Sequence, residues 1–350
     1  MADPSFDIVV PTIGRPSLPA LLEAIAVGEG ALPSRIFLVD DRRDPSGPLT
    51  EGSFPPRLTG RIQVLSGGGA GPAAARNCGW RASSAPWIAF VDDDVVPPRG
   101  WLTSLSEDLR ELPSDVAGSQ GAIRVPVASD RRPTDWERNV QGLERARWAT
   151  ADMAYRRRVL EEVGGFDERF PRAYREDADL ALRVLESGYR LVRGQRHVLH
   201  PVRPADWWVS VRLQAGNADD ALMRALHGPA WRTKAGVAAG RRGRHLLVTG
   251  LAFAALGGFA ARRRSLARIA AIGWLAGTAE LAWERVAPGP RTPAEVGTMS
   301  ATSAVLPVAA AYHWAWGVAR SRGAVPWTGS ETIRGETVRG EMIPAEGLAG

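Results

Sequence analysis

The chain has 350 residues, 45% of them hydrophobic and 23% charged, and this balance excludes a largely disordered protein. A typical domain holds about 100–200 residues, so a catalytic domain with a further C-terminal region is expected. The single cysteine, Cys78, excludes an internal disulfide and a cysteine-based zinc site, and it suits a reducing, cytoplasmic setting.

The net charge of +6 and the pI near 10.3 indicate an anionic partner. Nucleic acid is not expected, because the arginines are spread along the chain and Lys234 is the only lysine. Nucleotide diphosphates, acidic lipid headgroups and phosphorylated lipid carriers remain as partners. Residues 1–7 lack the pattern of a secretory signal.

Short apolar runs at 7–10, 35–39, 61–65 and 87–91 predict strands, and residues 18–27 and 72–82 have helical spacing. Strands alternating with helices predict an α/β fold with a mostly parallel sheet between helices. Ligands bind such sheets at the carboxyl ends of the strands. Two acidic groups stand at those ends, Asp40 with Asp41 and Asp92 with Asp93 and Asp94.

Further along the chain, helices are predicted at 159–163 and 180–186 and strands at 189–192 and 197–199. From about residue 203 the sequence becomes helical, arginine-rich and tryptophan-rich. The predicted domains are a catalytic domain at 1–202, a helical C-terminal region at 203–329 and a disordered tail at 330–350.

Two apolar stretches, 246–261 and 269–283, stand out in the helical region. Arginines flank the first, and Glu280 interrupts the second, so neither has the roughly 20 apolar residues of a spanning helix. One interpretation is a hairpin packed on itself or on the catalytic domain. The other is membrane surface contact through 241–285, with arginines as anchors.

The three consecutive acids after the strand 87–91 suit a divalent metal. Hard oxygen ligands bind Mg²⁺ or Mn²⁺, and clustered carboxylates need a positive partner. A divalent ion on a diphosphate would stabilise a leaving nucleotide. The alternative is a solvated acidic turn before Pro97 and Pro98.

The glycine run from Gly67 to Gly71 raises a second class of enzyme, a nucleotide-dependent oxidoreductase with a dinucleotide-binding loop. The third glycine position of that pattern falls on Pro72. A small-residue loop leading into Arg76 and Asn77 equally brings backbone N–H groups and a guanidinium to a diphosphate.

Acids at 176, 177 and 179 precede the predicted helix at 180–186. They can simply cap the helix and complement its dipole. Alternatively, one of them is a general base that deprotonates an acceptor hydroxyl.

Taken in order, six motifs across residues 6–200 resemble family 2 glycosyltransferases: Val9-Val10-Pro11-Thr12, Leu38-Val39-Asp40-Asp41, the stretch from Gly71 to Asn77, Phe90-Val91-Asp92-Asp93-Asp94, the stretch from Gly164 to Glu168, and the stretch from Glu176 to Arg183. The resemblance implies a GT-A fold and a metal-dependent transfer of sugar, with inversion, from a nucleotide-diphosphate sugar to a saccharide or lipid-linked acceptor. Asp152, just before Tyr155, departs from the pattern of many relatives in a way that bears on the acceptor.

By the same resemblance, each site residue has an expected role. Asp177 would be the catalytic base, with Glu176 beside it. The donor would contact Pro11, Thr12, Asp40, Arg76, Asp92 and Asp93. The metal would be held by Asp94, Asp92 and His200. The acceptor side would include Gly164, Gly165 and Phe166. A non-catalytic binding protein with the same fold is the third class left open. The cytoplasm, at the inner face of the plasma membrane, is the expected location.

Overall fold

The computed structural model describes residues 3–50 and 53–328, so the predicted tail at 330–350 lies outside the described residues. The chain divides into two compact units. The sheet unit holds the described residues of Met1–Pro126, Leu143–Pro201 and Pro326–Gly350, and the helical unit holds Val127–Gly142 and Val202–Val325. Each unit is described by itself.

The sheet unit is built on seven strands in the order β3-β2-β1-β4-β6-β5-β7. They are β1 (Phe6–Thr12), β2 (Ile36–Asp40), β3 (Ile62–Ser66), β4 (Trp87–Val91), β5 (Val116–Arg124), β6 (Asp152–Arg156) and β7 (Arg190–Leu199). Only β6 runs antiparallel to its neighbours. The carboxyl ends of β1, β2, β4 and β7 therefore meet at one edge of the sheet, which confirms the predicted α/β architecture.

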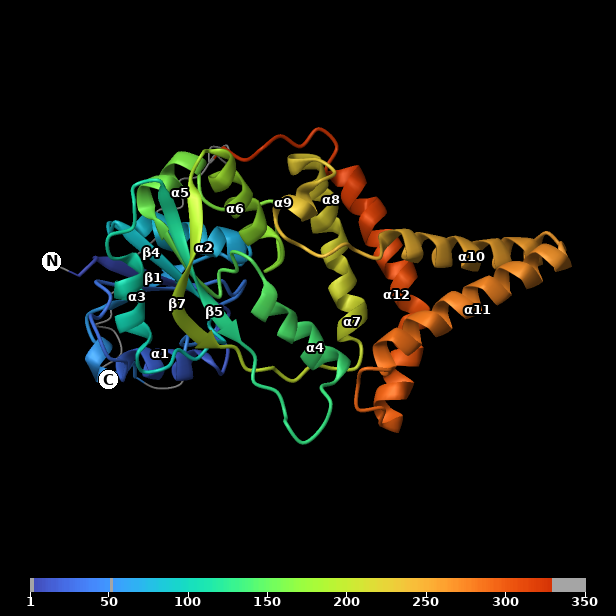
Figure 1. The fold of residues 1–350 in the computed structure, drawn as a ribbon, viewed down its shortest axis with the longest axis horizontal. Helices are drawn as coiled ribbons and strands as arrows, with labels where there is room; N and C mark the ends of the chain where they lie inside the picture. Colours follow the sequence, from blue (N-terminus) through green and yellow to red (C-terminus); the bar gives the residue numbers. More distant parts are fainter. Residues whose placement is uncertain (1–2, 51–52, 329–350) are drawn as a thin grey trace. The chain divides into compact units, whose positions relative to one another are not determined.

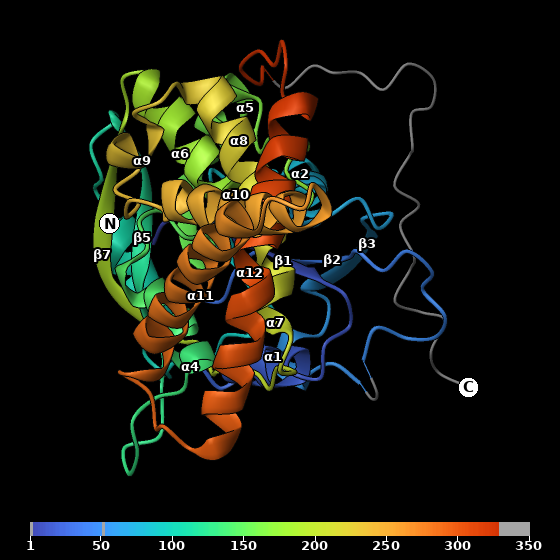
Figure 2. The same ribbon diagram turned by 90° about the vertical axis from the view of Figure 1, so that its right-hand side faces the viewer.

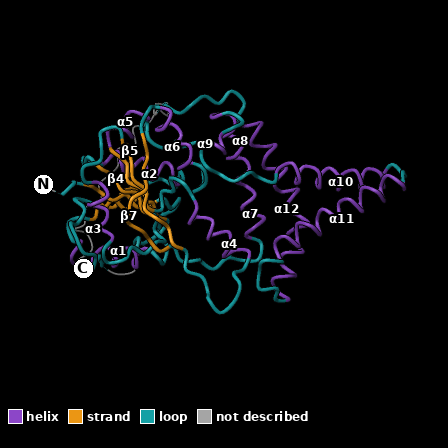
Figure 3. The backbone as a smooth tube through the Cα atoms, in the orientation of Figure 1, coloured by secondary structure: helices purple, strands orange, loops and turns teal. Residues whose placement is uncertain are grey.

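Helices cover both faces of this sheet, as Figure 3 shows for the orange strands between purple helices. One face packs against α2 (Pro72–Ala82), α5 (Arg157–Val163) and α6 (Glu176–Glu186) through a cluster of buried apolar side chains. The other helices of the unit are α1 (Leu18–Ala26) and α3 (Trp101–Leu109), which lie together because Glu29 exchanges backbone hydrogen bonds with Arg99 and Thr103. The short helix η1 (Pro56–Leu58) precedes β3.

Three elements of the sheet unit differ from the sequence expectations. The predicted strands at 189–192 and 197–199 are one continuous strand, β7. Strands β5 and β6 were not predicted, since β5 is rich in small and polar residues and β6 begins with a charged residue. Helix α6 begins at Glu176, so the acids predicted to precede it form its first turn.

In the helical unit, all the secondary structure of the described residues is helical, with loops between the helices. They are α4 (Asp135–Gln141), α7 (Val209–Arg212), α8 (Gly216–His227), α9 (Trp231–Lys234), α10 (Arg242–Ala260), α11 (Arg264–Val286) and α12 (Pro293–Arg320), with short turns at η2 (Gly142–Arg145), which straddles the unit boundary, and η3 (Leu213–Ala215). Helix α12 contacts α7, α8, α10 and α11. Helix α4 joins this unit through Asp135, which pairs with the buried Arg285 of α11 at 2.8 Å.

Helices α10 and α11 form an antiparallel hairpin, and both views show them side by side (Figures 1 and 2). They contain the apolar stretch at 269–283 and all but the last residue of the stretch at 246–261. Among the residues that the structure describes, α10 is the one helix whose length and composition would allow it to cross a membrane.

Candidate active site

The three acids after β4 point in different directions, as successive residues leaving a strand do. Asp93 is buried and turned toward β1, where it accepts hydrogen bonds from Thr12 Oγ1 and Arg15 Nη1, both at 2.6 Å. Asp94 is also buried, whereas the side chain of Asp92 is 25% exposed. Asp93 therefore fixes the end of β1 against the end of β4.

Asp94 lies beside the end of β7. The imidazole Nε2 of His200 is 3.5 Å from Asp94 Oδ1, and the backbone N–H of His200 donates to the carbonyl of Arg124. The buried His200 Nδ1 has no hydrogen-bond partner among the described residues. The parallel arrangement of β4 and β7 thus brings together two residues that are more than a hundred positions apart in the sequence.

Asp94 and His200 are a pair and not a complete metal cage. In residues 3–50 and 53–328, no group of three or more His, Cys, Asp and Glu side chains is arranged to hold a metal ion. A carboxylate and an imidazole with an unsatisfied ring nitrogen still suit a divalent ion that takes its remaining ligands from a bound diphosphate and water.

Arg76 on α2 is the centre of the charge arrangement. Its guanidinium is almost fully buried and donates to Asp92 Oδ1 at 2.8 Å and to Glu176 Oε1 at 2.9 Å. It also lies 5.6 Å from the ring centre of Phe166, on the ring face. Arg76 therefore joins the acids at the strand end to the first turn of α6.

Glu176 and Asp177 stand side by side in that first turn. Burial raises the pKa of Glu176 to about 8; the charge of Asp177 adds to this rise, and Arg76 opposes it. Burial also raises the pKa of Asp177, against the hydrogen bond that its Oδ1 accepts from the N–H of Ala178 at 2.7 Å. A carboxylate with a raised pKa is a stronger base, which suits proton abstraction.

Arg175 immediately precedes these acids and has a φ of 80°. A left-handed conformation is unfavourable for a residue with a side chain and costs about 1–3 kcal/mol. The strain is located at the turn that sets the direction of Asp177, where the surrounding contacts hold it in place.

Asp40 is the last residue of β2, and Arg42 forms a bidentate ion pair with it. Arg42 Nη2 is 2.6 Å from Asp40 Oδ2, and Arg42 Nε is 2.9 Å from Asp40 Oδ1. Pro11 lies in the adjacent strand β1 and pairs in register with Val39. A nucleoside that reaches Asp40 would have to share it with Arg42.

The glycine loop after β3 is tied to β2. The N–H of Gly71 donates to Asp41 Oδ2 at 3.0 Å, and Gly69 packs so tightly on Arg43 that a Cβ there would lie 2.8 Å from its Cα. One of the N–H groups that a dinucleotide diphosphate would need is therefore bound to a carboxylate of the chain itself.

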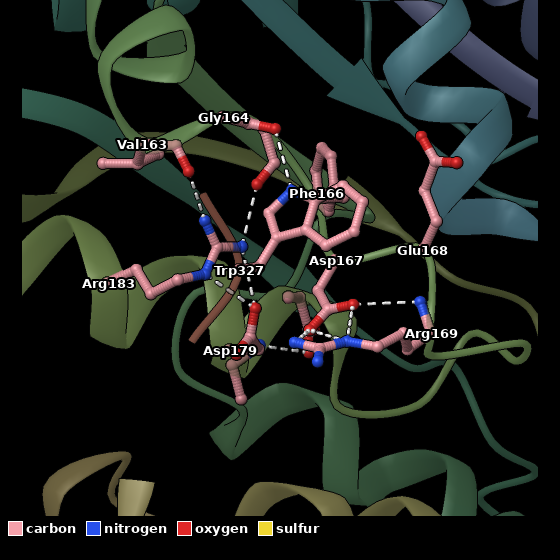
Figure 4. Close-up of polar contacts among 12 residues, drawn as sticks. Val163, Gly164, Phe166, Asp167, Glu168, Arg169, Asp179, Arg183 and Trp327 are labelled. Carbon is pink, nitrogen blue, oxygen red and sulfur yellow. Dashed lines mark hydrogen bonds and ion pairs between the residues drawn. The ribbon is translucent and has the colours of Figure 1, made fainter. Parts of the chain in front are cut away.

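Gly164 and Gly165 form the turn after α5, with φ values of 78° and 72°. A Cβ on Gly165 would lie 2.5 Å from Asn77 Oδ1, so this position has no room for a side chain. Arg183 on α6 donates to the carbonyl of Val163 and pairs with Asp179, as Figure 4 shows. It also donates to the carbonyl of Gly165.

Phe166 follows this turn and is fully buried, packed edge-on against Phe90 with ring centres 5.0 Å apart. Its side chain supports the guanidinium of Arg76. Trp327, from the end of the described chain, donates to the carbonyl of Gly164 at 3.0 Å (Figure 4). The three residues expected on the acceptor side therefore contribute a rigid backbone turn and a support for Arg76.

Asp152, which departs from the family's pattern, starts β6 beside Val91. It is 1% exposed and accepts hydrogen bonds from Trp101 Nε1 at 2.9 Å and Arg196 Nε at 2.8 Å. Arg196 also pairs with Asp108. Asp152 belongs to a buried structural network, which accounts for its charge without an acceptor.

Sequence reasoning did not identify Arg15 and Arg42, which bind Asp93 and Asp40. The available signal was their place, within three residues of the ends of β1 and β2. A cation at the carboxyl end of a strand belongs to the same crevice as an acid there.

Comparison with known proteins agrees with this geometry. The model of glycosyl transferase family 2 matches residues 7–181, which is half of the chain. The pre-mycofactocin glycosyltransferase of two Mycobacterium tuberculosis strains, CDC 1551 / Oshkosh and H37Rv, is 33% identical over 133 residues. That match covers 35% of this chain and 28% of the relative, so the chain spans little more than a quarter of these proteins.

Among solved structures, the mannosyltransferase PcManGT from Pyrobaculum calidifontis, in complex with GDP-Man and Mn²⁺, superimposes with a TM-score of 0.51. It is 16% identical, and the match covers 90% of this chain and 88% of that one. The likeness shows a shared GT-A fold. From the family model and the arrangement of its motifs, the chain belongs to glycosyl transferase family 2.

Proposed function

We propose that the chain transfers a sugar from a nucleotide-diphosphate sugar to an acceptor hydroxyl, with inversion at the anomeric carbon and with the help of Mn²⁺ or Mg²⁺. The observation that carries this proposal is the buried guanidinium of Arg76, which binds Asp92 on one side and Glu176 on the other. Through it, the acids at the donor end of the sheet and the candidate base on α6 form one site.

Asp177 is the general base of this reaction. Its carboxylate takes the proton of the acceptor hydroxyl while that oxygen attacks the anomeric carbon. The bond from the anomeric carbon to the diphosphate breaks on the opposite face, and the nucleoside diphosphate leaves with the electron pair. A single displacement of this kind inverts the anomeric configuration.

Arg76 and Glu176 position the reacting groups. The charge of Arg76 is held between two carboxylates in a buried place, and it would stabilise a diphosphate bound beside Asp92. Glu176 holds Arg76 from the acceptor side and stands next to Asp177. Pro11, Thr12, Asp40 and Asp93 form the proposed nucleoside side of the crevice at the ends of β1, β2 and β4.

Asp94 and His200 would hold the divalent ion, with Asp92 beside them. The unsatisfied Nδ1 of His200 and the closeness of its Nε2 to Asp94 support this assignment. A divalent ion bound there would neutralise the charge that develops on the leaving diphosphate. The presence of GDP-Man and Mn²⁺ in a protein of the same fold is consistent with this donor and metal class.

The proposed acceptor is a saccharide or a lipid-linked sugar. We place the reaction in the cytoplasm at the inner face of the plasma membrane, with the membrane contacted through residues 241–285. The exposed apolar side chains of α10 and α11 support that contact.

The geometry supports an oxidoreductase less well. The N–H of Gly71, which a dinucleotide would use, already donates a hydrogen bond to Asp41. A non-catalytic binding protein would not require the buried and half-buried acids at 92, 94, 176 and 177. Such a cluster is costly to keep unless it serves a reaction.

Thermal unfolding with ligands separates these classes. We expect UDP or GDP with Mn²⁺ to raise the Tm, and NAD to leave it unchanged, because binding to the folded state stabilises it. The Asp94→Asn variant should lose the part of the shift that depends on Mn²⁺. Stabilisation by NAD alone would instead support the oxidoreductase.

A further inference from the structure

The hairpin of α10 and α11 has an unusual distribution of side chains for a helix pair in water. Only 17% of the apolar window in α10 is buried. Seven large apolar side chains are each more than 60% exposed, namely Leu247, Phe253, Leu256, Phe259, Ile269, Ile272 and Trp283. A helix that is apolar on all sides is normally covered by protein or by lipid.

Glycines of each helix lie in the seam between the two helices, where they contact side chains or backbone of the other helix. A Cβ on Gly258 would lie 3.0 Å from the backbone N of Ala267, and one on Gly277 would lie 2.6 Å from Val248 Cγ2. Gly273 is similarly close to Leu251. Glycines at the contact between two helices, with large apolar residues facing outward, are typical of helix pairs in lipid, where packing and not the hydrophobic effect holds the helices together.

Charges stand at both ends of this apolar surface, and the two ends differ. At the base, Arg244 pairs with Glu280 at 3.0 Å and with Glu284 at 3.1 Å, and Arg241 also binds Glu284. At the tip, Arg262, Arg263, Arg264 and Arg268 are exposed and, within the described chain, form no ion pair. The base is largely neutralised by its own acids, whereas the tip carries an uncompensated positive charge.

We infer that the α10–α11 hairpin is embedded in one leaflet of an anionic bilayer, lying along the membrane surface with its tip arginines at the lipid phosphates. This inference deepens the proposed membrane contact and uses no step of sugar transfer. The positive tip is complementary to anionic headgroups, and the apolar flanks are complementary to the acyl chains.

Length and charge favour embedding over spanning. Between Arg244 and Arg262 the helix rises about 26 Å, and between Arg268 and Glu280 only about 17 Å, against a hydrocarbon core of about 30 Å. Spanning would also carry four tip arginines across the membrane, which the preference of arginine for the cytoplasmic side opposes. In the surface orientation all the charged groups stay at headgroup level.

The test uses the full chain and vesicles of phosphatidylcholine with 30% phosphatidylserine. A fluorophore is attached at Phe253→Cys in a Cys78→Ser background, because Cys78 is the only natural cysteine. We expect brighter, blue-shifted emission with vesicles and stronger quenching by lipids that carry the quencher near the headgroup than by lipids that carry it deep in the chain. A label at Val27→Cys, an exposed apolar position of the sheet unit, should not respond.

Co-sedimentation with the same vesicles tests separately the contribution of the apolar flanks and that of the tip arginines to binding. Ile272→Glu should abolish binding, whereas the matched Val27→Glu should not. Replacing Arg262, Arg263 and Arg264 together by Gln should weaken binding on the order of a hundredfold. The matched replacement of the exposed Arg99, Arg145 and Arg147 should have a much smaller effect.

Four results would overturn the inference: no vesicle binding by the unaltered chain, equal loss in the tip variant and its control, strongest quenching by the deep quencher, and burial of the label in a protein dimer without lipid. None of these measurements uses a nucleotide or an acceptor. Failure here and failure of the proposed transfer are therefore distinguishable.

Discussion

The two units distribute their charged and apolar side chains in opposite ways. The sheet unit buries its large apolar residues and also places charged groups inside, with Arg76 and Glu176 each about 2–3% exposed. The helical unit exposes large residues such as Phe259 and keeps most of its arginines at the surface. The buried charge of Arg76 and Glu176 belongs to the candidate active site, and the exposed apolar surface of the hairpin belongs to the proposed membrane contact.

The largest expected difference between substitutions in the two units is in their effect on turnover. Asp177→Asn removes the proposed base while keeping its size, and we expect transfer to fall by about 10²–10⁴-fold. Steady-state release of nucleoside diphosphate, with unfolding measured in parallel, would show a loss of rate without a loss of fold. Ile272→Glu, in the helical unit, is the control and should keep its turnover on a water-soluble acceptor.

The second effect is on stability. Arg76→Met leaves Glu176 and Asp92 without their buried partner and should lower the free energy of unfolding by about 3–5 kcal/mol. Arg244→Met breaks exposed pairs in the helical unit and should cost about 1 kcal/mol or less. Urea titration of both variants measures the difference, and equal costs would contradict the distinction between the units.

The third effect is on pH dependence. Burial raises the pKa of Asp177, and the base must be deprotonated to act, so turnover should be lost as the pH falls through that raised pKa. On the acid side the rate should then fall about tenfold for each pH unit. The profile of kcat/KM against pH should show its acid limb above the ordinary range of an aspartate, and a limb near pH 4 would contradict the assignment.

The smallest expected effect is a difference in unfolding free energy between the same substitution, Ile→Val, made in each of the two units. Ile88→Val removes a methylene from the core at β4, the strand that precedes Asp92; Ile88 is fully buried, and the change should cost about 0.5–1.5 kcal/mol. Ile272→Val, at a position that is 66% exposed, should change the stability in water by less than about 0.5 kcal/mol. Denaturation without lipid measures both, and a clear cost for Ile272→Val would mean that protein covers the hairpin.

Much of this fold could be predicted from local patterns. Strands β1 to β4 and helix α2 follow from short apolar runs and from Pro72 at a helix start. Strands β5 and β6 could not be found this way, because their stability comes from neighbours. The charge of Asp152 is compatible with a strand only because Arg196, 44 residues away, pairs with it.

The site shows the same division. The acids could be named because they follow buried strands in a family order. The contacts between these groups could not be predicted, because they join residues that are far apart in the sequence. Arg76 and Glu176 are 100 positions apart, and Asp93 and Arg15 are 78 positions apart. The exposed surface of the hairpin is likewise invisible in the sequence, where an apolar helix in a protein core and one in lipid have the same composition.

The most direct test of the central claim is a panel of UDP- and GDP-sugars incubated with the protein and simple saccharide acceptors, with Mn²⁺ and with a chelator. We expect one donor to release its nucleoside diphosphate with Mn²⁺ and not with the chelator. The glycoside formed should show, by proton NMR, the anomeric configuration opposite to that of the donor. Turnover that is unchanged by the chelator, or a product with retained configuration, would contradict the account.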